Sequence, residues 1–223
     1  MRPFTIIGMP GSGKSAVTHA LAEKYAMPVI STDAVIFKEA RKDAKHPVTA
    51  AYLASFEKTY GKKLEDPALL QDMPNFIEQH SEKAFRDLEE QAVIYAFDTG
   101  RLKDTIPDLS GSGFMREKIR AALKKHGVVS VWLDAPDGLI LRNLMKDYED
   151  SARTGQIKRS GYFHIAKTAA DKGLDPAAAL DEYSKGQRPI RVPHYALADI
   201  AVKLANDEPL HSVIGRVETA LRS

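Results

Sequence analysis

The fold is decided by residues 8–15, which read Gly8-Met9-Pro10-Gly11-Ser12-Gly13-Lys14-Ser15. They match the pattern Gly-x-x-x-x-Gly-Lys-[Ser/Thr] at every fixed position. A short apolar run, residues 4–7, precedes the loop. Apolar residues at helical spacing follow it: Ala16, Val17, Ala20, Leu21 and Tyr25. Strand, glycine-rich loop and helix in this order predict a phosphate-binding loop.

The residue types of this loop suit the phosphate groups of ATP with Mg²⁺. Glycines let the backbone turn its N–H groups inward, and the following helix directs its positive end at the phosphates. Lys14 would bridge the outer phosphates, and Ser15 would offer a hydroxyl to the metal. The expected nucleotide-binding residues are Gly11, Ser12, Gly13, Lys14, Ser15 and Ala16. The alternative is a tight turn with an incidental lysine.

A phosphate loop fixes the nucleotide but leaves the reaction open, because kinases, GTPases and motor ATPases share it. The guanine-reading pattern Asn-Lys-x-Asp is absent from the sequence. At 223 residues the chain is also too small for a typical motor core. These observations favour a kinase that phosphorylates a small metabolite.

Bulk composition restricts the possible partners. The net charge is +2, from 32 Lys and Arg against 30 Asp and Glu, so no general basic surface for nucleic acid is expected. The chain has no cysteine, which excludes disulfides and thiolate zinc sites and suits a cytoplasmic protein. No apolar run approaches the length of a membrane span or of a signal peptide. We expect one domain over residues 1–223, cytoplasmic, and a monomer or weak homodimer.

The rest of the chain alternates strands with helices, which predicts a parallel, doubly wound sheet. Further strands are expected at residues 29–30, 105–109, 128–134 and 199–204. Further helices are expected at residues 76–97, 117–125, 139–148, 176–183 and 213–221. A competing interpretation makes residues 92–97 a strand. Residues 38–75 predict short helices over one end of the sheet, and residues 150–187 an excursion from it.

Four further motifs follow the phosphate loop in order. Asp33 lies just after the second strand, and residues 85–89 read Phe-Arg-Asp-Leu-Glu. Residues 110–113 read Ser-Gly-Ser-Gly, and residues 191–195 read Arg-Val-Pro-His-Tyr shortly before the last strand. In this order and at these places the chain resembles the shikimate kinase family. The resemblance implies a three-layer α/β/α P-loop fold with a five-stranded parallel sheet, a helical lid and a substrate-binding insertion.

The resemblance also implies an acceptor site for shikimate or a close analogue, and a place in aromatic amino acid biosynthesis. Asp33 would take the proton of the acceptor hydroxyl, and Arg86 and Arg191 would grip the substrate carboxylate as guanidinium forks. Gly111 and Gly113 would let backbone amides approach the substrate. Each has a plainer alternative: a helix cap for Asp33, a solvated helix face for Arg86, a structural loop position for Arg191, and a flexible turn for the two glycines.

The excursion, about residues 150–188, resembles the family lid that closes over ATP, and about residues 34–90 would form the acceptor-binding region. Arg159 is the lid residue expected to neutralise the transferring phosphate, with Arg153 and Lys158 as competitors in what is otherwise a solvated charge run. Pro209 resembles the family proline that packs on adenine, or simply starts a helix.

The sequence also departs from the family pattern. Ser31 stands where the family has a second aspartate near the metal, and we assign it with Ser15 to the metal site. Ser112 replaces the middle glycine of the triple-glycine turn. Asp98 and Asp134 are alternative acidic metal partners, although an ordinary helix cap is the favoured role for Asp134. Other possibilities are a gluconate or nucleoside kinase, a nucleotide-binding regulatory module, and, against the balanced charge, a nucleic-acid kinase.

Overall fold

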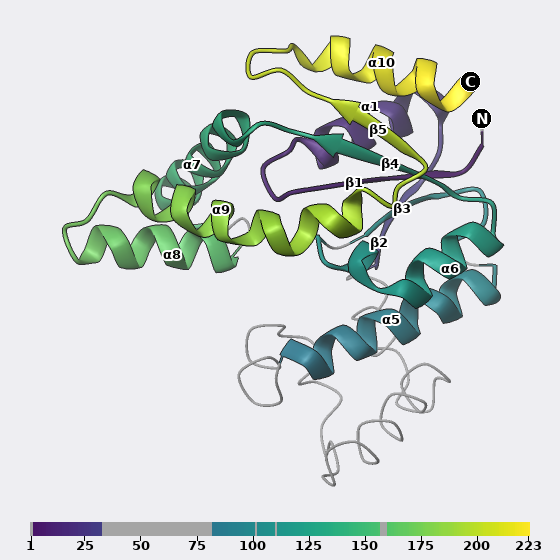
Figure 1. The fold of residues 1–223 in the computed structure, drawn as a ribbon, viewed down its shortest axis with the longest axis horizontal. Coiled ribbons are helices and arrows are strands. Elements are labelled where there is room, and N and C mark those ends of the chain that lie inside the picture. The colour runs from purple at the N-terminus through teal and green to yellow at the C-terminus, as the bar shows by residue number, and fades with distance from the viewer. Residues whose placement is uncertain (1, 33–81, 101, 110, 157–159) are drawn as a thin grey trace, which may run out of the picture. The chain divides into compact units, whose positions relative to one another are not determined.

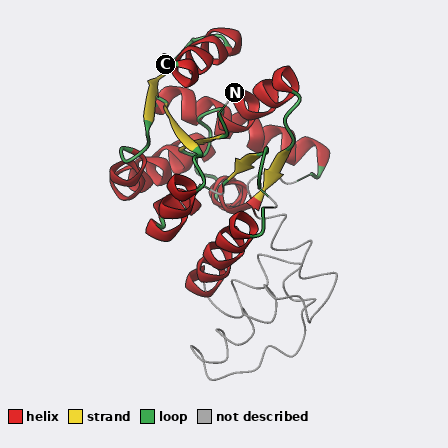
Figure 2. Ribbon diagram, turned by 90° about the vertical axis from the view of Figure 1, so that its right-hand side faces the viewer, coloured by secondary structure: helices red, strands yellow, loops and turns green. Residues whose placement is uncertain are grey.

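The structure, a computed structural model, describes residues 2–32, 82–100, 102–109, 111–156 and 160–223. Its internal contacts divide the chain into two compact units. Unit 1 contains residues 6–24 and 129–223, and unit 2 contains residues 2–5 and the described part of 25–128. Helices make up most of the described residues and the strands are short (Figure 2). None of the described helices has the length and hydropathy that crossing a bilayer requires.

The main sheet has three strands, β1 (Phe4–Gly8), β4 (Val129–Asp134) and β5 (Ile200–Lys203), in the order β1-β4-β5 (Figure 1). β1 is buried along its whole length, as expected of a strand covered on both faces. β4 and β5 are parallel, with Val131 opposite Ile200. The two elements that flank the phosphate loop, β1 and α1 (Lys14–Tyr25), are therefore confirmed.

Unit 1 also carries four helices in its C-terminal half. They are α7 (Asp137–Thr154), α8 (Ser160–Asp171), α9 (Pro176–Tyr195) and α10 (Leu210–Arg222). α7, α8 and α9 pack on one another, and α10 packs on β5 (Figure 1). The expected excursion from the sheet is thus helical. The expected short helices within residues 38–75 lie outside the described residues.

Helix α9 is twelve residues longer than the expected segment 176–183, because it continues through two prolines to Tyr195. The loop position expected for Arg191 is therefore wrong. Pro189 and Pro193 are four residues apart and both exposed, so their rings and missing N–H groups fall on one solvent-facing side. Packing of the opposite face, with Leu180, Ser184 and Tyr195 buried, holds the helix together.

Unit 2 has a parallel strand pair, β2 (Val29–Ser31) and β3 (Ile106–Asp108), with Val29 opposite Ile106. Its helices are α5 (Glu82–Asp98), the short 3-10 turn η2 (Gly113–Met115) and α6 (Glu117–Lys125). α5 runs unbroken through residues 92–97, so the competing strand interpretation is wrong. Several apolar side chains of this unit are almost fully buried: Ala92, Val93, Ile106, Phe114 and Ile119.

The single five-stranded sheet is not confirmed, because the described strands form one three-stranded and one two-stranded sheet. Pro107, in the middle of β3, has no N–H to donate to a ladder. Its carbonyl instead accepts a hydrogen bond from the hydroxyl of Thr5, at the start of β1, over 2.6 Å.

Candidate active site

The phosphate loop joins β1 to α1 through residues 9–13 and turns sharply. The backbone N–H of Ser12 donates to the carbonyl of Met9 over 3.0 Å, which closes the turn. Gly11 and Gly13 have φ angles of +86° and +85°, in a region that costs other residues about 1–2 kcal/mol. These two positions therefore need glycine; Gly13 is a fixed position of the motif, whereas Gly11 stands at one of its variable positions.

Helix α7 braces the loop from one side. Asn143 Nδ2 donates to the carbonyl oxygen of Gly11 over 2.8 Å. A Cβ atom added at Gly11 would lie only 2.8 Å from the carbonyl oxygen of Ile140 and 3.2 Å from Leu144 Cγ. The loop thus rests directly on α7, whereas a Cβ at Gly13 would meet nothing within 4 Å.

Gly11→Ala is expected to destabilise the protein more than Gly13→Ala. Both substitutions force alanine to a positive φ, but only the first also drives a methyl group into the backbone of α7. Overpacking of this kind costs about 1–3 kcal/mol beyond the backbone strain. Chemical unfolding of both variants measures the difference. Equal losses would show that α7 does not press on the loop.

Asn143 is a site residue that sequence reasoning missed, since its partner is 132 positions away. Asn143→Ala leaves the Gly11 carbonyl without this donor, and we expect about 1 kcal/mol weaker ADP binding, roughly a fivefold higher Kd. Calorimetric titration measures this. Lys146→Ala, an exposed change one turn further along α7, is the matched control and should leave the Kd unchanged. An unchanged Kd in Asn143→Ala would remove Asn143 from the site.

Asp134 ends β4 but does not cap the following helix. The N-cap of α7 is Pro136, without a side-chain capping bond, so the capping role favoured for Asp134 is wrong. Its carboxylate lies instead 3.6 Å from the guanidinium of Arg188, on α9. Arg188 also donates to the carbonyl of Ala135 over 3.0 Å and to Asp137 over 2.8 Å. Arg188 therefore ties α9 to the segment that leads into the loop-bracing helix.

The loop and the start of α1 fit the phosphates of a nucleotide. The amides of the first helical turn have no acceptor within the helix, and the helix dipole favours an anion there. Lys14 and Ser15 stand at this end of α1, partly exposed. No cluster of three or more His, Cys, Asp or Glu that could hold a metal occurs among the described residues. Mg²⁺ commonly relies on one or two protein ligands, water and phosphate oxygens, so Ser15 is a suitable ligand.

Unit 2 carries the acceptor-side candidates. Arg86, on α5, has a side chain only 22% exposed, and its Nη1 lies 3.0 Å from Oε2 of the fully buried Glu89. A simply solvated helix face is therefore wrong for Arg86. Gly111 and Gly113 precede and begin η2, and Ser31 ends β2. The carboxylate of Asp98 forms a surface ion pair with Lys125, with 2.6 Å between Oδ1 and Nζ.

Two further candidates lie in unit 1. Arg191 Nε donates to Gln187 Oε1 over 3.2 Å along α9. Burial raises the pKa of the neighbouring Tyr195 hydroxyl, while the Arg191 guanidinium acts in the opposite direction. Pro209 is the N-cap of α10, which agrees with the helix-start interpretation, and its contact with adenine stays a prediction.

The structure thus brings together residues 11–16 at the phosphate loop, and separately Arg86 with its carboxylate partner. Asp33 and Arg159 lie outside the described residues. Arg86 belongs to unit 2 and Arg191 to unit 1, so their joint grip on a substrate carboxylate stays a prediction.

Comparison with known proteins gives a match to one family model and several similar proteins. Residues 62–169 match the family model described as Shikimate kinase. Shikimate kinase of Rhodopseudomonas palustris is 25% identical over 220 residues, covering 99% of this chain and 81% of that protein. Two solved structures share the fold. Shikimate kinase of Bacteroides thetaiotaomicron has a TM-score of 0.62 at 15% identity, covering 100% of this chain and 99% of that one.

The second is shikimate kinase of Acinetobacter baumannii in complex with shikimate, with a TM-score of 0.58 at 17% identity. The alignment covers 100% of this chain and 93% of that one. The resemblance carried by the sequence motifs is therefore confirmed.

Proposed function

We propose that this chain, a homologue of the shikimate kinases over almost its whole length, transfers a phosphoryl group from ATP to a hydroxyl of shikimate, forming shikimate 3-phosphate. The observation that carries this proposal is the phosphate loop at the start of α1, braced by α7, in a chain of which 99% aligns with a shikimate kinase. The cofactors are ATP and Mg²⁺. Transfer of the γ-phosphoryl group from ATP to an alcohol, with release of ADP, makes the chain an ATP:alcohol phosphotransferase.

The chain's own residues bind and orient the reactants. The loop amides and the N-terminus of α1 hold the phosphates. The Lys14 ammonium stabilises the negative charge that develops on the transferred group. Ser15 would hold Mg²⁺ through its hydroxyl, and Ser31 is the other residue that we assign to the metal. When bound, ATP would supply the phosphoryl group, and Mg²⁺ would neutralise part of the negative charge of that group.

On the acceptor side, Asp33 orients the attacking hydroxyl and receives its proton. Arg86 and Arg191 bind the carboxylate, and the amides near Gly111 and Gly113 contact the ring substituents. Glu89, buried against Arg86, fixes the direction of that guanidinium.

A lid at about residues 150–188, with Arg159, would exclude water while transfer takes place. Residues 34–90 would form the acceptor-binding region within one P-loop kinase domain spanning residues 1–223. A monomer or weak homodimer in the cytoplasm, without nucleic-acid partners, completes the proposal.

A coupled assay of ADP release tests the proposed substrate. Shikimate should stimulate ADP release strongly over the rate without acceptor. Gluconate and a nucleoside, tested at the same concentration, should not. Stimulation by one of these alone would replace shikimate as substrate. ATP binding without stimulation by any acceptor would instead indicate a regulatory module.

A further inference from the structure

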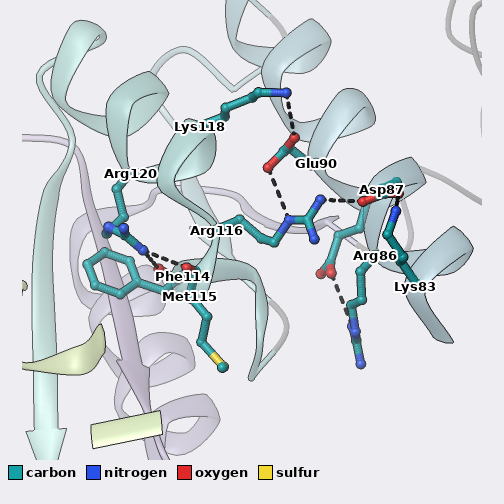
Figure 3. A network of polar contacts seen from close by, with 10 residues as sticks. Lys83, Arg86, Asp87, Glu90, Phe114, Met115, Arg116, Lys118 and Arg120 are labelled. Atoms are coloured by element: carbon teal, nitrogen blue, oxygen red, sulfur yellow. Dashed lines mark hydrogen bonds and ion pairs between the residues drawn. The ribbon is translucent and has the colours of Figure 1, made fainter. Parts of the chain in front are cut away.

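Residues 111–115 of unit 2, which we name the glycine turn, are connected to helix α5 by one arginine. Arg116 follows η2 directly and is the N-cap residue of α6. Its Nε donates to Glu90 Oε2 over 3.0 Å, and its Nη2 donates to Asp87 Oδ1 (Figure 3). Asp87 and Glu90 are one helical turn apart on α5, so the planar guanidinium spans both carboxylates. We name these three residues the Arg116 bridge.

The bridge is sheltered and strongly charged. The Glu90 side chain is only 10% exposed, and those of Arg116 and Asp87 are about one third exposed. Burial opposes ionisation of Asp87, but hydrogen bonds from Lys83 and Arg116 hold the pKa of its carboxyl below the usual value. Asp87 therefore stays charged at neutral pH beside the Arg116 guanidinium, and charge-assisted hydrogen bonds of this kind are stronger than neutral ones.

The two ends of the bridge carry different parts of the acceptor site. On α5, Asp87 is next to Arg86 in the chain. At the other end, the backbone N–H of Arg116 donates to the carbonyl of Gly113 over 3.1 Å, so the residue that carries the guanidinium is hydrogen-bonded to the turn. Arg120 also holds this turn, because its Nη1 donates to the carbonyls of Phe114 and Met115 (Figure 3).

One polar atom in the turn has no partner of its own. Ser112 Oγ is buried, yet it makes no hydrogen bond within the described residues. A buried hydroxyl left without a partner costs about 1–3 kcal/mol, which a ligand's polar group can recover. This supports placing the turn, and not only Arg86, beside the acceptor.

We propose that Arg116 is a positioning residue for the acceptor: by joining the glycine turn to Asp87 and Glu90, it sets the distance between the turn's amides and Arg86. This inference rests on the proposed function. Binding groups must be held within a fraction of an ångström for a substrate to be oriented productively. Loss of the bridge would therefore weaken acceptor binding while leaving the phosphate loop, in unit 1, unaffected.

Steady-state kinetics of Arg116→Gln test the proposal. We expect the KM for shikimate to rise about tenfold, an effect near 1.4 kcal/mol, with the KM for ATP changed less than about twofold. Arg116→Lys keeps the positive charge but not the planar guanidinium, so its KM for shikimate should lie between those of the wild type and Arg116→Gln. Lys118→Gln is the matched control, because Lys118 pairs with the same Glu90 at 3.2 Å but its side chain is 75% exposed.

Coupling and exchange separate positioning from general instability. Asp87→Asn should raise the same KM, and the double variant with Arg116→Gln should be no worse than the more affected single one. Hydrogen exchange at the amides of Met115 and Arg116 should accelerate in Arg116→Gln and not in Lys118→Gln. This readout needs no acceptor.

The outcomes distinguish the two claims. Wild-type protein without shikimate-dependent turnover would refute the proposed function. Active wild type, with Arg116→Gln unchanged in the shikimate KM or equally impaired for ATP, would overturn the role of Arg116.

Discussion

Lys14→Met is expected to lower kcat by about 10²–10³-fold, the usual effect of removing one preorganised charge or donor aimed at a reacting group. Methionine keeps the length of the side chain but removes its ammonium, which would otherwise follow the charge on the transferred phosphate. Lys14 begins α1 outside the buried core, so the free energy of unfolding should change little. Initial rates of ADP release at saturating ATP and shikimate measure the loss.

Lys24→Met controls for the removal of a lysine from the same helix. Lys24 lies in the last turn of α1, is 53% exposed and pairs with Glu218. Surface pairs of this kind contribute little, and its kcat should match that of the wild type. A Lys14→Met enzyme that keeps kcat within a few-fold would show that the loop does not handle the reacting phosphate.

Asp33→Asn is expected to lower kcat by about 10²–10⁴-fold while leaving the Kd for ADP unchanged. The amide has the shape of the carboxylate but cannot receive the hydroxyl proton. Turnover and calorimetric ADP titration of the same preparation measure both effects. The matched control is Asp171→Asn, on the surface of α8, where the carboxylate pairs with Lys167 over 2.8 Å.

The result for Asp33 also discriminates between classes of protein. If Asp33→Asn turns over like the wild type, the residue does no more than cap a helix. If its ADP affinity falls along with kcat, Asp33 serves the nucleotide and not the acceptor.

Local sequence signals were sufficient where one segment determines its own structure. The phosphate loop needs glycine at positions 11 and 13, and the structure shows positive φ angles at both. Residues 117–125 form a helix with the predicted bounds, ended by Gly127 at φ +67°. Periodicity also predicted α5 correctly against the strand alternative, because the apolar residues continue at helical spacing through residues 92–97.

Long-range contacts explain what the sequence did not reveal. Helix α9 continues past Pro189 because both of its inner prolines face solvent, and no propensity rule contains that information. Asn143, Arg116 and Arg188 act on partners far away in the chain, so no spacing marks them. Asp134 matched a capping pattern, but its carboxylate pairs with Arg188, which lies on another helix.

The central claim is that residues 8–15 enclose the phosphates of a nucleotide, and its most direct test is equilibrium binding of ADP to the purified chain with Mg²⁺ by calorimetry. The account predicts saturable binding of one ADP per chain, weakened by Asn143→Ala and unchanged by Lys146→Ala. If a folded protein gave no measurable heat of binding at millimolar ADP, the result would contradict this claim.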